Sequence, residues 1–149
     1  MGYIGTSQVP NRAGRENHNA EANWNWDAGK QVQVSCFTNC EEAELFLNGQ
    51  SLGKKDRKSA ANHIITWNVA YEAGTLLVKG YNKGVAVSSY QLVTTGKPYA
   101  IKPLEKAYVG KDGIVQVALG VFDEQGNLVT SADNEISINI KGDVQLLGL

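Results

Sequence analysis

The chain has 149 residues, of which 42% are hydrophobic and 19% are charged, and its formal net charge is −1. A charge this close to zero provides no field that would attract nucleic acid or an anionic membrane. No apolar run approaches the roughly 20 residues that a membrane-spanning helix needs. We therefore expect a globular protein of one or two small domains, with no nucleic-acid partner and no membrane partner.

The first 23 residues are polar, with Asn, Gly and Arg scattered among few apolar positions. They show neither helical nor strand periodicity, which predicts a polar N-terminal arm over residues 1–23. The segment also lacks the apolar core of a signal peptide. It therefore gives no indication of the compartment.

Ordered structure is expected to begin at Trp24, Asn25 and Trp26. In an extended segment, alternation places the indoles of Trp24 and Trp26 on one face. Two interpretations remain open for them. They are core side chains, which is the favoured reading, or they form an exposed platform on which a sugar ring stacks.

The next segments alternate between apolar and polar residues with a period of two. Gln31–Thr38 and Ala43–Leu47 read as strands, and Asn48-Gly49 is the favoured pair for a two-residue turn in which both residues need positive φ. Gln50–Lys54 returns as the partner strand. Further strands are expected at 64–69, 75–81 and 85–94, joined by short turns that contain Gly. Short strands at this spacing predict an all-β, immunoglobulin-like sandwich over residues 24–95.

A boundary is expected at residues 94–98, because Thr-Thr-Gly-Lys-Pro suits a short linker. Strands are expected beyond it at 100–104, 114–122, 136–140 and 144–147. About fifty residues are too few for a complete sandwich of this class, so residues 96–149 are interpreted as a second, partial Ig-like domain. An unpaired edge there would favour self-association.

Residues 54–62 contain four basic side chains and read as a solvated loop. No aromatic residues are interleaved with them to stack on bases, which argues against nucleic-acid binding.

The chain has two cysteines, Cys36 and Cys40, which are too few for a disulfide scaffold. They are read as unpaired, buried thiols, with a local disulfide as the alternative.

No constellation of catalytic residues is evident. Glu41 and Glu42 are adjacent, so on a strand they point to opposite faces and cannot flank one bond. Glu44 shares a face with Glu42 beside the hairpin, where solvation is the simpler account. Neither His18 nor His63 has a nucleophile or a metal-ligand spacing around it. We expect no catalytic residue, no metal site and no cofactor in this chain.

One more segment, Asp123–Asn127, contains acidic residues and a glycine. It lacks the regular alternation of oxygen ligands found in a calcium loop. A hairpin turn is therefore the better interpretation.

Three pieces of the sequence together resemble a known family. They read NWNWDAGKQVQVSCFTNCEEAELFLNGQSLGKK, ITWNVAYEAGTLLVKGYNKG and VTTGKP. They are similar to the accessory domain that follows the catalytic barrel in family 2 glycoside hydrolases, enzymes usually described as β-galactosidases and often found in gut Bacteroidetes. The segment from AIKP onward resembles the start of the bacterial Ig-like domain that comes next in these enzymes.

The resemblance implies a non-catalytic part of a larger hydrolase, in which two barrel glutamates would act as acid/base and nucleophile. No motif of that barrel occurs here, so no catalytic residue is carried over. The implied partner is the catalytic barrel of the same protein, and the implied location of the parent is the periplasm or the cell surface. A different class of function, a carbohydrate-binding module that uses exposed Trp24 and Trp26, is the alternative.

Overall fold

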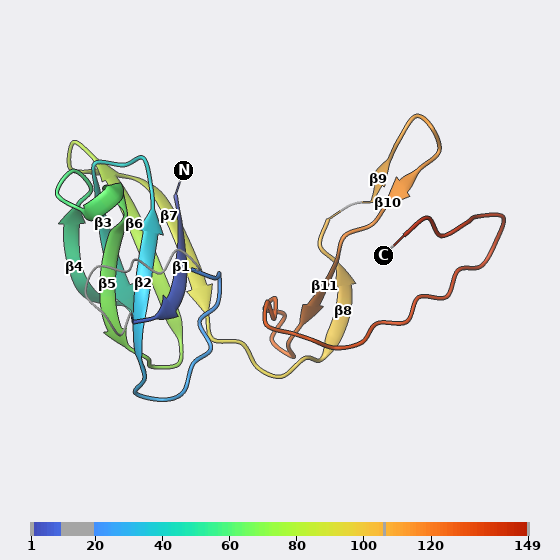
Figure 1. The fold of residues 1–149 in the computed structure, drawn as a ribbon, viewed down its shortest axis with the longest axis horizontal. Helices are drawn as coiled ribbons and strands as arrows, with labels where there is room; N and C mark the ends of the chain where they lie inside the picture. Colours follow the sequence, from blue (N-terminus) through green and yellow to red (C-terminus); the bar gives the residue numbers. More distant parts are fainter. Residues whose placement is uncertain (1, 10–19, 106, 149) are drawn as a thin grey trace.

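The computed structural model describes residues 2–9, 20–105 and 107–148. Figure 1 shows a sandwich of two sheets, followed after β7 (Val85–Val93) by a second region of short strands. Every named strand pair is antiparallel. The predicted all-β, Ig-like class is therefore confirmed.

The sandwich consists of a three-stranded and a four-stranded sheet. The first has the order β1-β2-β5, with β1 (Tyr3–Gln8), β2 (Gln31–Phe37) and β5 (Ile65–Ala70). The second has the order β4-β3-β6-β7, with β3 (Glu42–Leu47), β4 (Gln50–Asp56), β6 (Thr75–Asn82) and β7 (Val85–Val93). The strands expected between residues 31 and 94 are all present, with boundaries within two residues of those expected.

Two turns follow directly from local chemistry. Asn48 and Gly49, between β3 and β4, have φ of 50° and 85°, as a two-residue hairpin turn of type I′ demands. Lys83 and Gly84, between β6 and β7, have φ of 50° and 78°. Both hairpins thus place glycine where an L side chain would be strained.

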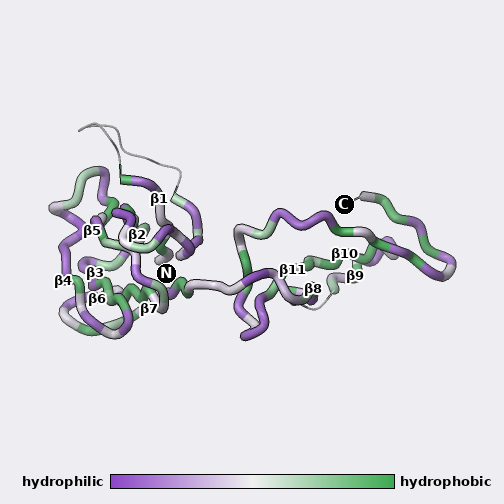
Figure 2. The backbone as a smooth tube through the Cα atoms, turned by 90° about the horizontal axis from the view of Figure 1, so that it is seen from below, coloured by the Kyte–Doolittle hydropathy of each residue, from purple (hydrophilic) through white to green (hydrophobic). Residues whose placement is uncertain are grey.

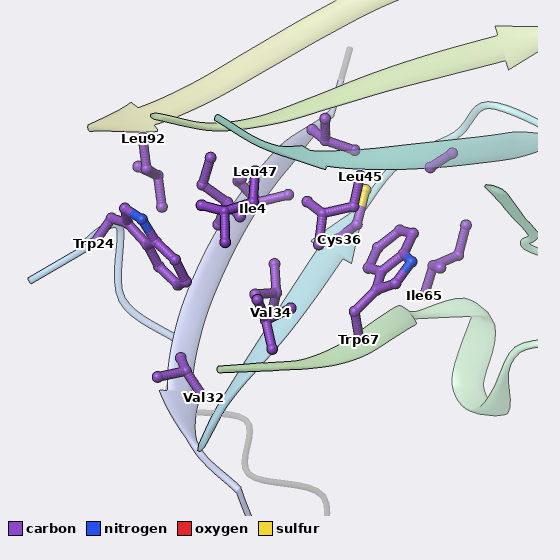
Figure 3. Close-up of a cluster of buried hydrophobic side chains, with 14 of the residues drawn as sticks. Ile4, Trp24, Val32, Val34, Cys36, Leu45, Leu47, Ile65, Trp67 and Leu92 are labelled. Atoms are coloured by element: carbon purple, nitrogen blue, oxygen red, sulfur yellow. The ribbon is translucent and has the colours of Figure 1, made fainter. Parts of the chain in front are cut away.

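The core lies between the two sheets and is built mainly from alternate residues of β2, β3, β5 and β6 (Figure 3). Ala43, Leu45 and Leu47 of β3 are buried while their neighbours are partly exposed, as the period of two predicts. Trp67 of β5 lies in the same cluster and is 4% exposed. Complete burial of each large apolar side chain contributes about 1.5–3 kcal/mol, which makes this cluster the main source of stability.

The prediction of a polar arm over residues 1–23 is wrong for residues 3–8, which form a strand. Residues Tyr3–Gln8 form β1, which pairs with β2 along its whole length. Ile4 is fully buried, and Gly5 lies close against Ala20. The strand was not recognised in the sequence because its composition is hydrophilic and only Ile4 supplies a large side chain to the core. His18 lies outside the described residues.

The second region has two small sheets. One pairs β8 (Ala100–Pro103) with β11 (Leu119–Phe122), and the other pairs β9 (Tyr108–Val109) with β10 (Val115–Gln116). The expected strand at 114–122 is therefore divided in two, since its halves pair with different partners. The strands expected at 136–140 and 144–147 are not formed, because within the described residues no neighbouring strand pairs with them. Figure 2 shows apolar stretches along this region.

The single helical element in the described part of the chain is a short 3-10 turn, η1 (Ala61–His63). It lies in the loop between β4 and β5, where Asn62 and His63 have positive φ. No helix among the residues described has the length or apolar character needed to cross a membrane.

Candidate functional site

Trp24, the first residue proposed to contact carbohydrate, is a core side chain. It is 1% exposed, and its ring meets the ring of Tyr71 edge-on with centroids 5.1 Å apart. Figure 3 shows it pointing between the sheets toward the other buried residues. Its indole Nε1 finds no acceptor among the described residues. Burial of Trp24 agrees with the favoured interpretation, a core side chain, and contradicts the alternative in which Trp24 is exposed on a platform for sugar.

Trp26 is partly exposed and has a different environment. Its Nε1 donates a hydrogen bond to Thr6 Oγ1 at 3.1 Å, and Lys30 Nζ lies 5.1 Å from the ring centroid. These contacts fix the ring against β1 and place a cation near it. Because Trp24 is buried, the two indoles do not form the shared platform that a sugar ring would need.

A polar network covers the outer face of the four-stranded sheet. Glu44 accepts hydrogen bonds from Ser51 Oγ at 2.7 Å and from Tyr81 Oη at 2.9 Å. Lys54 Nζ lies 3.7 Å from the Tyr81 ring centroid and 3.6 Å from a carboxylate oxygen of Glu42. We call Glu42, Glu44, Ser51, Lys54 and Tyr81 the Glu44 network.

Hydrogen bonds within the Glu44 network shift the pKa values of Glu44 and Tyr81. The hydrogen bond from Ser51, followed by that from Tyr81, lowers the pKa of Glu44 because both donors favour the carboxylate. The same carboxylate raises the pKa of Tyr81. A carboxyl group held ionised in this way is a poor proton donor at neutral pH, so the arrangement suits cross-strand support better than general acid catalysis.

Cys36 and Cys40 are both unpaired and buried, as the favoured reading predicted. Burial raises the pKa of Cys36 to about 12, so its thiol stays protonated. Burial also opposes ionisation of Cys40, but hydrogen bonds with Thr38 and Ser88, together with the positive charge of Arg57, lower the pKa of that thiol.

A small hollow lies beside Cys36. It is lined by residues that include Gly2, Cys36, Gly80 and Tyr90, and its cavity volume is about 10 Å³. Such a space holds about one water molecule. It offers no room for a substrate next to Cys36.

Asp123 has a structural role in its turn. Its carboxylate accepts hydrogen bonds from the backbone N–H of Gly96 at 2.9 Å and of Asn127 at 2.7 Å. The Asn127 side chain donates another at 3.1 Å. These donors, with that of Gly96 first, lower the pKa of Asp123. Because its oxygens are occupied by N–H groups, the segment forms a turn and not a calcium loop. No cluster suited to a metal ion occurs among the described residues.

Comparison with known proteins agrees with this geometry. Residues 29–88 match the model of a family described as a domain of unknown function, DUF4982. A Bacteroides ovatus protein named beta-galactosidase BoGH2A is 35% identical over 130 residues, which are 85% of this chain and 15% of the relative. A Formosa agariphila protein named putative beta-glucuronidase is 32% identical over 126 residues, which are 81% of this chain and 12% of the relative.

Solved structures give the same result. A glycosyl hydrolase family 2 member from Bacteroides cellulosilyticus superposes with a TM-score of 0.71 at 29% identity, covering 86% of this chain and 18% of that one. This chain is a small part of a family 2 glycoside hydrolase protein. A beta-glycosidase from Bacteroides vulgatus, at 22% identity and a TM-score of 0.63, shares the fold over 85% of this chain and 15% of its own.

The family 2 segment spans about 12–15% of the length of the curated relatives that it matches. The match is thus consistent with an accessory domain of a glycosidase.

The sequence analysis missed two further residues with a clear role, Asn25 and Thr95, whose hydrogen bonds join parts of the chain 70 residues apart. No sequence pattern indicated this role, since Asn and Thr also occur in loops where they make no such hydrogen bonds.

Proposed function

We propose that this chain is a non-catalytic accessory region of a family 2 glycoside hydrolase and that its sandwich packs against the catalytic barrel of the same protein. The observation that carries the proposal is the match itself: the chain aligns over most of its length with glycosidases but accounts for 12–18% of each. The acidic residues considered for catalysis support it, since Glu44 is engaged with Ser51 and Tyr81.

Exposed apolar side chains of the sandwich suggest where the barrel makes contact. Val85 and Val87 of β7 are 64% and 54% exposed, and Tyr3 of β1 is 53% exposed. Tyr3 stacks on Phe37 with centroids 4.9 Å apart, which presents a flat aromatic surface. β7 is an edge strand of its sheet, so its outer side is open to a neighbour. Covering these side chains would add about 25 cal/mol per Å² of apolar surface.

The alternative function, carbohydrate binding through exposed Trp24 and Trp26, has lost its main support. Trp24 is 1% exposed, and Trp26 already bonds to Thr6 and lies beside Lys30. We therefore propose that the role of the chain is to contact the barrel. By that contact it would shape the approach of substrate to the barrel or support contacts between subunits. Location of the parent in the periplasm or at the cell surface stays a prediction from the resemblance.

The test compares Val87→Glu with Ser89→Glu, both at exposed positions of β7. Each variant is made in this chain and in the longer protein that carries it. We expect Val87→Glu to lower the temperature at which the longer protein loses glycosidase activity, because a charge would be desolvated against the barrel. Neither variant should change the melting temperature of the 149-residue chain by itself, and Ser89→Glu should be near neutral in both.

Two outcomes would contradict the proposal. One is a longer protein whose inactivation temperature is the same with Val87→Glu as without it. The other is hydrolysis of nitrophenyl β-galactoside or β-glucuronide by the purified 149-residue chain at a rate above buffer, since that would make the chain itself catalytic.

A further inference from the structure

The connection between β7 and β8 is held at three successive residues. Residues 94–98 were expected to act as a short linker between two domains. In the structure, Thr94, Thr95 and Gly96 each make hydrogen bonds to segments distant in sequence. The bonds come from both regions, which a free linker would not show.

Thr94 is fixed by the sandwich. Its Oγ1 donates a hydrogen bond to the Trp24 carbonyl at 3.0 Å and accepts one from the Gly74 N–H at 3.0 Å. The Tyr71 hydroxyl lies 3.1 Å from the same oxygen. The Thr94 N–H donates to the Gly74 carbonyl at 2.8 Å. Both its backbone donor and its side chain are therefore engaged.

Thr95 is fixed by a single amide side chain. Its N–H donates to Asn25 Oδ1 at 2.9 Å, and its carbonyl accepts from Asn25 Nδ2 at 2.8 Å. Asn25 thus pairs with the backbone of Thr95 as a neighbouring strand would. Asn25 belongs to the segment that leads into β2, so this pair anchors the connection to the sandwich.

Gly96 is fixed by the second region. Its N–H donates to Asp123 Oδ2 at 2.9 Å, and Asp123 is 2% exposed. Asp123 is itself held in place by the Asn127 N–H and side chain. A separate tie lies outside the connection, where Thr130 Oγ1 donates to the Ala22 carbonyl at 3.0 Å.

We infer that Thr94–Gly96, together with Asn25 and Asp123, forms a rigid joint that fixes the orientation of the second region relative to the sandwich. Bending the connection would break hydrogen bonds to a buried carboxylate and leave backbone groups unpaired, which is unfavourable. The joint would present the second region in one direction, so that it extends the sandwich as a spacer of fixed geometry. This inference does not depend on what the sandwich itself contacts.

The test measures residual dipolar couplings of the complete 149-residue chain in an aligned medium. We expect the sandwich amides and the β8–β11 amides to fit a single alignment tensor. Asn25→Ala should separate them into two tensors, with weaker alignment and a shorter rotational correlation time for the second region. Asp27→Ala, an exposed change two residues away, is the matched control and should retain one tensor.

Asp123→Ala examines the other side of the joint, with Glu124→Ala in the same turn as its control. If the chemical-shift dispersion of the β8–β11 amides shows that Asp123→Ala unfolds the second region, that variant is set aside. The result for Asn25→Ala then tests the inference by itself, because this substitution changes only the sandwich side of the joint. Two independently tumbling regions in the unaltered chain would overturn the inference. So would a single tensor retained by Asn25→Ala.

Discussion

The two regions of this chain have similar sequences in one respect and different structures. Both contain apolar residues that alternate along short segments, such as Ala43–Leu47 in the first region and Ile136–Ile140 in the second. In the sandwich, Leu45 is fully buried, whereas Ile138 in the second region is 40% exposed. Alternation therefore selects which face of a strand is apolar, but only a facing sheet buries that face.

The sandwich has a second sheet at the right distance and the second region does not. Between residues 99 and 148 the structure describes only two two-stranded sheets, and Val129 is its single buried hydrophobic residue there. A two-stranded sheet is marginal by itself in water. The free energy of unfolding should therefore reside almost entirely in the sandwich, and this contrast can be tested.

The largest expected effect comes from truncating the sandwich core. Leu45→Ala should lower the free energy of unfolding by about 2–5 kcal/mol, because it removes buried methyl groups and leaves a cavity. Ile138→Ala, its matched change in the second region, should cost less than about 0.5 kcal/mol. Urea unfolding followed by far-UV circular dichroism, which reports on the strands of both regions, measures both. Equal losses would show that the second region has a core of its own.

A smaller effect is expected at the turns. Gly49→Ala places a Cβ at φ of 85° between β3 and β4, in a position with no neighbour within 4 Å. The cost is therefore backbone strain alone, about 1–2 kcal/mol. Gly126→Ala, at the same φ and equally open in the turn after β11, should leave the main unfolding transition unchanged. A matching shift in both variants would mean that the two regions unfold as one cooperative unit.

The smallest effect concerns acid stability of the Glu44 network. The pKa of Glu44 is lowered in the folded state, so its contribution to stability is present above the unfolded-state pKa of about 4.3 and is lost as pH falls through the folded-state pKa. Removing the donor with Tyr81→Phe should therefore reduce the difference in stability between neutral and acidic pH. Thermal melts at a series of pH values measure this. Asp27→Asn, at an exposed position, is the control, and an unchanged pH dependence in Tyr81→Phe would contradict the assignment.

Much of the fold was predictable from the sequence because its signals are local. The Asn48-Gly49 turn, the alternation in β3 and the Gly-containing turns each specify backbone geometry over a few residues. β1 escaped prediction because its burial depends on pairing with β2, some thirty residues away, and not on its own composition.

The candidate site was less predictable. Trp24 and Trp26 look equivalent in sequence, yet one packs against Tyr71 inside the core and the other bonds to Thr6 at its margin. Which indole enters the core is decided by how residues 20–26 run across the end of the sandwich. Glu44 was expected to be solvated and is partly exposed, but the sequence did not show that the hydroxyls of Ser51 and Tyr81, from two neighbouring strands, bind its carboxylate.

The all-β class and the sandwich strands between residues 31 and 94 could be read from the sequence, because period, turn chemistry and residue type are properties of short segments. Burial of Trp24, completion of a sheet by β1 and the hydrogen bonds of Asn25 and Asp123 with the connection after β7 depend on the three-dimensional packing. These contacts join residues between 24 and 70 positions apart. Such pairings depend on how whole sheets are placed, and the nearest neighbours of a residue in sequence carry no information about them.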